Sequence, residues 1–118
     1  DGWETRRSRG KNFDWLILKC AASGVIEKLQ IDTHHFKGNY PDKCSVQAGY
    51  LKRNSSPKNI VKKSKSWKFI LGKSKLKAHK EHNFKIPNNN KHIVNYIRIN
   101  IFPDGGISRL RAFGTVKT

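Results

Sequence analysis

The sequence predicts an all-β fold, a β-sandwich or jelly roll, and three observations carry this prediction. Apolar residues recur at every second position in several short segments, which is the period of a half-buried strand. Turn-forming residues separate these segments at intervals of roughly 8 to 15 residues. No segment has the 3.6-residue period that is typical of an amphipathic helix. We therefore expect seven or eight short strands packed in layers.

The first half of the chain contains three of these strands. Residues 1–11 are polar and turn-like. The apolar run 12–19 indicates a strand that is buried on both faces, and 25–33 alternates like a half-buried strand. Glycine, asparagine, proline and aspartate make 34–42 a loop, and the alternation of 43–51 indicates another strand.

The middle of the chain is polar and strongly basic. Residues 52–66 are expected to form a lysine-rich loop, followed by a short strand over 67–71. A second lysine-rich loop is expected at 72–81, before a short strand over 82–86. The three consecutive asparagines within 87–91 indicate a turn.

The C-terminal segment has the clearest hairpin signature. Isoleucines alternate up to Ile101, Pro-Asp-Gly-Gly at 103–106 turns the chain, and alternation resumes over 107–115. Proline presets one turn angle and the glycines tolerate positive φ. We predict a strand, a tight turn and a strand, with Arg109 and Arg111 on one face.

Composition limits the possible partners. The chain has 118 residues, 25 Lys and Arg against 8 Asp and Glu, and a net charge of +17. A small domain usually carries a net charge of roughly 2 to 8 in magnitude, and self-repulsion destabilises a compact fold. A polyanionic partner is therefore expected, with nucleic acid first and an anionic membrane face second. The sequence contains no apolar run of the ~18 residues that a membrane helix needs.

Two cysteines, Cys20 and Cys44, lie in strand-like runs. A disulfide between them is possible, but two thiols do not make a disulfide framework, so buried free thiols are favoured. No spacing supports a metal site that combines cysteine and histidine. The sequence identifies no cofactor.

Three sequence blocks resemble the allantoicase family. They are residues 1–7 (Asp-Gly-Trp-Glu-Thr-Arg-Arg), 14–15 together with 31–42, and 100–113. Their order and spacing match one allantoicase repeat from the first to nearly the last residue. The resemblance implies one galactose-binding-like, discoidin-type jelly roll over 1–118. It also implies hydrolysis of allantoate to ureidoglycolate and urea in purine breakdown.

The chain departs from the family pattern in three respects. Family members usually carry two such repeats, and this chain holds one. The family's leading segment, with an opening strand, is missing, so an open sheet edge is expected, which another chain could complete. The region 52–91 is more basic than is usual in the family, which favours a different partner.

The arginines of the first and last blocks form a candidate substrate clamp. Guanidinium groups bind carboxylates bidentately and donate to urea carbonyls, and allantoate offers both groups. The alternative is a structural role, in which these arginines pair with nearby carboxylates. The predicted substrate-binding residues are Arg6, Arg7, Lys37, Asn39, Asp104, Arg109 and Arg111.

Hydrolysis requires an activated water, which a histidine or a carboxylate supplies, with or without a metal. Neighbouring residues of an extended chain face opposite ways, so at most one of the two adjacent histidines points into a given pocket. Carboxylates in turns more often cap backbone amides. The predicted catalytic residues are Glu4, Asp32, His34 and His35.

The region 52–91 carries thirteen basic residues against the single acid Glu81. Such loops suit phosphate contacts that position a protein without reading sequence. Trp67 lies between them, where either base stacking or a core role is possible. The predicted RNA-binding residues are Lys52, Arg53, Lys58, Lys62, Lys63, Lys65, Trp67, Lys73, Lys75, Lys77 and Lys80.

Two functions compete on this pattern. The favoured hypothesis is a basic structural subunit of a large ribonucleoprotein, such as a mitochondrial ribosome, built on a recruited allantoicase-type domain that binds RNA and neighbouring proteins. The alternative is a working allantoicase, located in the cytoplasm or peroxisome. The charge favours the first and the intact motifs favour the second. A membrane-surface role ranks third, because no basic amphipathic helix is visible.

Overall fold

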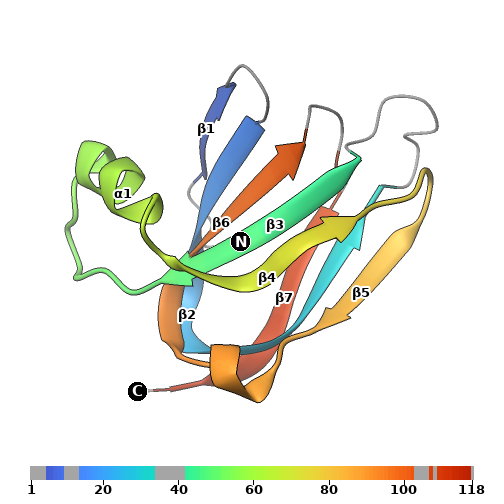
Figure 1. Ribbon diagram of the computed structural model, residues 1–118. Helices are drawn as coiled ribbons and strands as arrows, with labels where there is room; N and C mark the ends of the chain where they lie inside the picture. Colours follow the sequence, from blue (N-terminus) through green and yellow to red (C-terminus); the bar gives the residue numbers. More distant parts are fainter. Residues whose placement is uncertain (1–4, 10–13, 34–41, 103–106, 108, 118) are drawn as a thin grey trace.

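The structure, a computed structural model, describes residues 5–9, 14–33, 42–102, 107 and 109–117 (Figure 1). Seven strands, one α-helix and one 3-10 helix make up this part of the chain. In order they are β1 (Thr5–Arg9), β2 (Asp14–Asp32), β3 (Lys43–Gly49), α1 (Pro57–Ser64), β4 (Lys68–Lys75), β5 (Glu81–Lys85), η1 (Asn88–Asn90), β6 (Ile93–Phe102) and β7 (Arg109–Val116).

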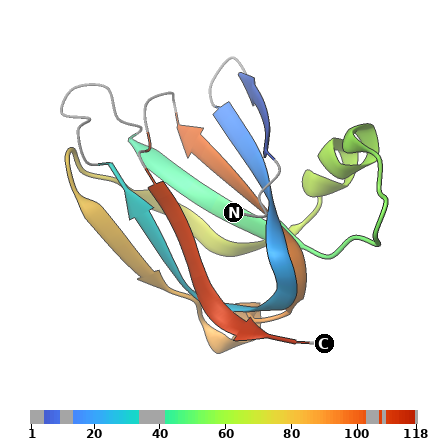
Figure 2. The same ribbon diagram turned by 180° about the vertical axis from the view of Figure 1, so that it is seen from behind.

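The long strand β2 belongs to both layers of a sandwich. Its first part pairs with β1 and β6, and the sheet continues through β3 to β4. Its second part, from Gly24 onward, pairs with β7 on one side and β5 on the other. The register shifts between Lys19 and Gly24, where the strand curls from one layer into the next (Figures 1 and 2). The predicted all-β jelly-roll sandwich is confirmed.

The predicted C-terminal hairpin is wrong in its pairing. β6 pairs with β2 and β3, whereas β7 pairs with the second part of β2. Among the described residues, no register joins β6 to β7, so the connection between them carries the chain from one layer to the other. A local turn signal shows that the chain reverses direction. It does not identify the strand with which the next segment pairs.

A helix lies where a lysine-rich loop was expected. α1 begins after Ser56, whose hydroxyl accepts a hydrogen bond from the backbone N–H of Asn59 at 3.2 Å, and Pro57 occupies its first turn. Within α1 only Ile60 and Ser64 are buried, so the sequence shows too few apolar positions to reveal a helical period. The second expected loop is also shorter, because β4 extends to Lys75.

The main core lies between the two layers. Alternate residues of β3 and β6 point into it, while the residues between them point to the outer face of the five-stranded sheet. A smaller cluster on that outer face joins α1 to the sheet. The buried members of the main core are Ile26, Leu29, Ile31, Cys44, Val46, Ala48, Ile70, Leu76, Ile86, Val94, Ile97, Ile99 and Ile101.

β7 packs very closely on β2 at a glycine. A Cβ built on Gly114 would fall on the carbonyl oxygen of Val25 and 3.0 Å from the Cα of Ile26. Gly114→Ala is expected to cost about 1–3 kcal/mol of unfolding free energy, because backbone has to move. Gly72→Ala is the matched control, since nothing lies within 4 Å of its Cβ position. Urea denaturation of both variants measures the difference, and equal stability would contradict the close packing.

Both cysteines are free thiols in the structure. Burial raises the pKa of Cys44 to about 12 and that of Cys20 to about 11, from an ordinary value of 9.0. Only the thiolate is nucleophilic, so the folded protein is expected to resist iodoacetamide at about pH 8. Labelling of the folded protein should increase only as the pH approaches these raised values, whereas denatured protein should label near the ordinary value. Rapid labelling of native Cys44 at about pH 8 would contradict this.

Candidate functional site

The described parts of the second and third sequence blocks meet at one edge of the sandwich. β2 ends at Asp32 opposite Arg109, the first residue of β7. At the same edge β6 ends at Phe102 opposite Lys43, the first residue of β3 (Figure 1). The backbone N–H of Asp42 donates to the carbonyl oxygen of Phe102 at 2.8 Å. Blocks far apart in the sequence therefore converge here, and we call this the motif edge.

Arg109 and Arg111 are exposed and share the outer face of β7, because Leu110 and Ala112 between them pack against the main core. Asp32 is 9% exposed and is engaged with other groups. For Arg6 and Arg7 the structure gives the backbone in β1 only, opposite Ile17 and Leu16 respectively. The remaining predicted residues, Glu4, His34, His35, Lys37, Asn39 and Asp104, lie outside the described residues.

Thr33 connects the motif edge to the loop before β5 through hydrogen bonds. It is fully buried, and its hydroxyl lies 2.6 Å from the carbonyl oxygen of Lys77 and 3.0 Å from that of Lys80. The same hydroxyl accepts from the backbone N–H of Lys80 at 3.1 Å. His82 adds a second link, because its Nε2 accepts from the backbone N–H of Lys77 at 2.9 Å while Nδ1 lies 3.0 Å from the carbonyl oxygen of Ile31. Thr33 in the motif therefore has a structural reason to be threonine.

Replacing Thr33 by valine keeps the shape of the side chain and removes the hydroxyl. Thr33→Val is expected to lower the free energy of unfolding by about 1–3 kcal/mol, because polar backbone groups near Lys77 and Lys80 lose their partner. Thr33→Ser keeps the hydroxyl and should retain most of the stability. Chemical denaturation of the two variants checks this. If Thr33→Val were as stable as the parent protein, the hydroxyl would have no structural role.

A pocket of about 630 Å³ lies on the outer face of the five-stranded sheet. The pairing of β3 with β6 brings together the residues that form its floor, since Arg98 of β6 is opposite Gln47 of β3 and Asn100 is opposite Ser45. Trp15 of β2 is opposite Asn100 on the other side. We call this the outer-face pocket. It is lined by Trp15, Ser45, Gln47, Lys65, Phe69, Gly72, Lys73, Arg98, Asn100 and Phe102.

The floor is a continuous chain of hydrogen bonds between side chains. Arg98 Nε donates to Asn100 Oδ1 at 2.9 Å, and Arg98 Nη1 donates to Ser64 Oγ at the end of α1 at 2.8 Å. Asn100 Nδ2 donates to Gln47 Oε1 at 3.0 Å and to Ser45 Oγ at 3.2 Å. Among the described residues, no buried side-chain nitrogen or oxygen lacks a partner. The floor is therefore rigidly specified.

The pocket is positively charged and partly aromatic. Arg98 is 5% exposed, and its guanidinium lies 4.7 Å from the ring centroid of Trp15. Burial lowers the pKa of the Arg98 guanidinium from its ordinary value, although arginine remains protonated. Lys73 Nζ lies 4.4 Å from the ring centroid of Phe102. No acidic residue is among the described residues that line the pocket.

Sequence reasoning missed Ser45, Gln47, Arg98 and Asn100 as site residues. A signal was present, because these polar residues alternate with the apolar residues of β3 and β6. This alternation shows that the two faces of each strand differ in polarity. It does not show that a helix and aromatic side chains cover that face and bury its polar groups.

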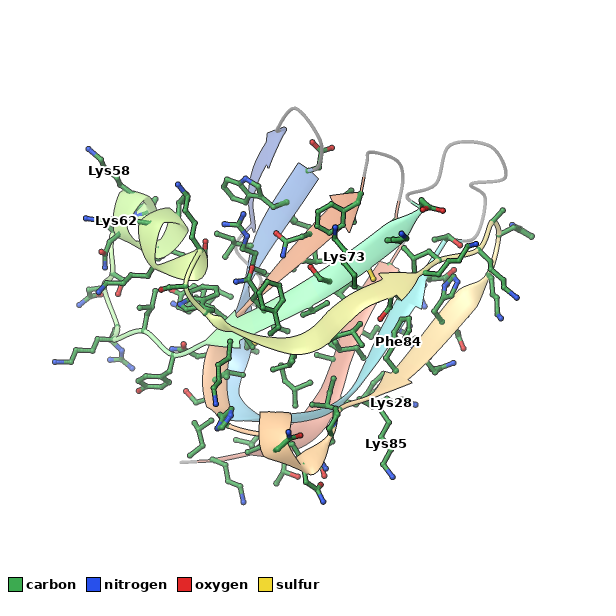
Figure 3. All side chains as sticks on the ribbon, in the orientation of Figure 1. Lys28, Lys58, Lys62, Lys73, Phe84 and Lys85 are labelled. Atoms are coloured by element: carbon green, nitrogen blue, oxygen red, sulfur yellow. The ribbon has the colours of Figure 1, made fainter. Side chains whose placement is uncertain are left out.

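The basic residues predicted to bind RNA are dispersed over several elements. Lys58 and Lys62 project from α1 (Figure 3), while Lys65 and Lys73 line the outer-face pocket. Trp67 is 9% exposed and packs on Tyr96 with ring centroids 5.8 Å apart, so its core role is confirmed and its ring is not available to stack on a base. The other predicted RNA-binding residues, Lys52, Arg53, Lys63, Lys75, Lys77 and Lys80, are exposed.

In the part of the chain that the structure describes, no group of three or more His, Cys, Asp or Glu is placed to hold a metal ion. The same part contains no helix with the length and apolar character needed to cross a membrane.

Comparison with known proteins gives a consistent family. The family described as "Allantoicase repeat" matches residues 1–117. A probable allantoicase 1 of Burkholderia mallei is 47% identical over 116 residues, which are 98% of this chain and 34% of that protein. A probable allantoicase of Stutzerimonas stutzeri is also 47% identical, over 98% of this chain and 35% of its own length. The chain thus spans about a third of the length of these relatives.

Solved structures agree with this match. The crystal structure of allantoicase from Saccharomyces cerevisiae superposes with a TM-score of 0.71 at 33% identity, covering 96% of this chain and 31% of that one. A module named CpGH89CBM32-6, produced by Clostridium perfringens, gives a TM-score of 0.64 at 12% identity, covering 98% of this chain and 95% of the module. This second likeness shows the fold alone.

These matches correct the favoured functional prediction. Relatives that are 47% identical over nearly the whole chain are named as probable allantoicases, so the ribonucleoprotein hypothesis is wrong. The predicted RNA and ribosomal partners, the RNA-binding residues and the mitochondrial location depended on that hypothesis and are withdrawn with it. Net charge was the misleading signal, because it describes the whole surface and identifies no site.

Proposed function

Because this chain belongs to the allantoicase family, we propose that it is one repeat of an allantoicase, folded as one domain over residues 1–118. The reaction is hydrolysis of allantoate to ureidoglycolate and urea in purine catabolism. The family match over 1–117 carries this proposal. The convergence of the second and third sequence blocks at the motif edge supports it, because a site needs residues from distant parts of the chain to come together.

Arginines at the motif edge suit the two polar features of allantoate. A carboxylate accepts two parallel hydrogen bonds from one guanidinium, and a ureido carbonyl accepts from another. Arg109 and Arg111 are exposed on the same face of β7 and are the members of this clamp whose side chains the structure describes. We also assign substrate binding to Arg6, Arg7, Lys37, Asn39 and Asp104.

The reaction needs a base that takes a proton from water as the water attacks the carbon bearing a ureido group. Asp32 is the described candidate. It ends β2 at the motif edge, opposite Arg109, and it is 9% exposed. Glu4, His34 and His35 are the other candidates for this base or for the acid that protonates departing urea.

Urea release from allantoate by the purified chain tests the proposal. We expect turnover with urea and ureidoglycolate formed in equal amounts, because one hydrolysis produces one molecule of each. The folded state of the sample is verified by circular dichroism before the assay. A folded chain that releases no urea above the uncatalysed rate would overturn the proposed function. The cytoplasmic or peroxisomal location stays a prediction.

A further inference from the structure

The outer-face pocket is built like a ligand site. Its volume of about 630 Å³ lies within the range of roughly 300–1,000 Å³ that is typical of small-molecule sites. Its floor is polar but almost completely buried, with Ser45, Gln47, Arg98 and Asn100 each 2–5% exposed. Buried polar groups are costly unless they are fully partnered, so such a floor is conspicuous on the outer face of a sheet.

Arg98 is the floor residue with hydrogen-bonding capacity left over. Its guanidinium has five N–H donors, and two of them are used, on Asn100 and Ser64. Both partners are neutral, as is the ring of Trp15 beneath the guanidinium. Gln47 and Asn100 are occupied with each other and with neighbouring groups. A buried cation with spare donors is best matched by a carboxylate.

The walls determine what else the ligand must be. Trp15, Phe69 and Phe102 are aromatic, and Phe69 is 54% exposed at the mouth of the pocket. Lys65 and Lys73 add positive charge without an acidic residue among the described lining groups. Flat apolar walls and a cationic floor select a small anion with a planar body.

We propose that the outer-face pocket binds a small carboxylate compound with a planar body, whose carboxylate pairs with Arg98 while the body lies among the aromatic rings. Lys73 supplies a second positive charge at the wall. The inference does not rest on the proposed function, because allantoate is assigned to the motif edge and not to this pocket. Benzoate is the probe, because it is a planar carboxylate unrelated to purine breakdown.

Two lysines provide a matched test of where the ligand binds. Lys73 lies over Phe102 at the pocket, and Lys28 lies over Phe113 at 4.8 Å on the other layer (Figure 3). Lys73→Met and Lys28→Met each remove one charge and one cation–π contact. Binding of benzoate, measured by calorimetry, should weaken by about two- to fivefold in Lys73→Met and stay unchanged in Lys28→Met. Equal weakening in both variants would show that net charge alone attracts the probe.

The role of Arg98 is tested from the ligand side and from the protein side. Benzamide has the shape of benzoate without its charge, and it should bind at least about tenfold more weakly. Arg98→Lys keeps the charge but loses the planar fork, and should weaken carboxylate binding by about tenfold. Should Arg98→Lys fail to fold, the comparison of benzamide with benzoate still tests whether the pocket recognises the carboxylate of the ligand.

Failure of this inference and failure of the proposed function give different results. Carboxylate binding that depends on Lys73, without any urea release, would contradict the proposed function alone. Urea release together with equal affinities for benzoate and benzamide would overturn the pocket assignment alone. Absence of benzoate binding would also overturn it.

Discussion

Replacing Asp32 by asparagine is expected to lower kcat for urea release by about 10²–10⁴-fold, the usual contribution of a general base. Asparagine has nearly the same size as aspartate but cannot accept the proton of the attacking water. KM should change much less, because the arginines and not Asp32 are assigned to hold the substrate. Steady-state kinetics with allantoate measure both parameters.

The matched control is Glu81→Gln. Glu81 is exposed and lies opposite Asp32 across the pairing of β2 with β5, so the substitution makes the same chemical change one strand away. It should leave kcat within about twofold. Thermal unfolding of both variants separates catalysis from folding, since Asp32 is also engaged with other groups. An active Asp32→Asn enzyme would shift the role of base to Glu4, His34 or His35.

Replacing Trp67 by alanine is expected to cost about 3–5 kcal/mol of unfolding free energy, the largest effect on stability that we predict. The indole joins α1 to the sheet through contacts within the small cluster of Ile17, Ile60, Trp67 and Tyr96. A side chain on Gly49 would collide with the indole ring, which shows how closely the ring packs on β3. Losing the ring leaves a cavity that Ile60 and Tyr96 cannot fill.

Phe69→Ala is the control for Trp67→Ala. Phe69 is an aromatic residue two positions further on and is 54% exposed, so its loss should change stability by less than about 0.5 kcal/mol. Urea denaturation followed by circular dichroism compares the two. Similar losses for both variants would mean that the cluster under α1 contributes little to folding.

The fold class and most strand positions could be read from the sequence, because burial on one face of a strand leaves a period of two. The alternation of Ile97, Ile99 and Ile101 places these residues in the core, where the structure finds them. Other features were misread. The two strands expected over 12–19 and 25–33 are parts of one long strand with a shift in register between them, and the segments of the expected C-terminal hairpin lie in two layers.

The candidate site was predictable in part. The second and third blocks, which were found by their resemblance to one family, meet at the motif edge in their described parts, and Thr33 shows that one motif position serves structure. The outer-face pocket was not predicted. In its floor, Asn100 donates hydrogen bonds to Ser45 and Gln47, which lie more than fifty residues earlier in the sequence. A local sequence pattern carries no information about such distant pairs.

The sequence by itself determined that this chain folds into β-strands, most of which alternate apolar and polar residues, and to which family its motifs point. These properties depend on local periodicity and on short runs of residues, both of which are visible in one dimension. Only the tertiary structure decided which strands pair, that β2 serves both layers, and that Arg98 is buried beside Trp15. Those features depend on contacts between distant segments, whose partners are selected by packing of the whole chain.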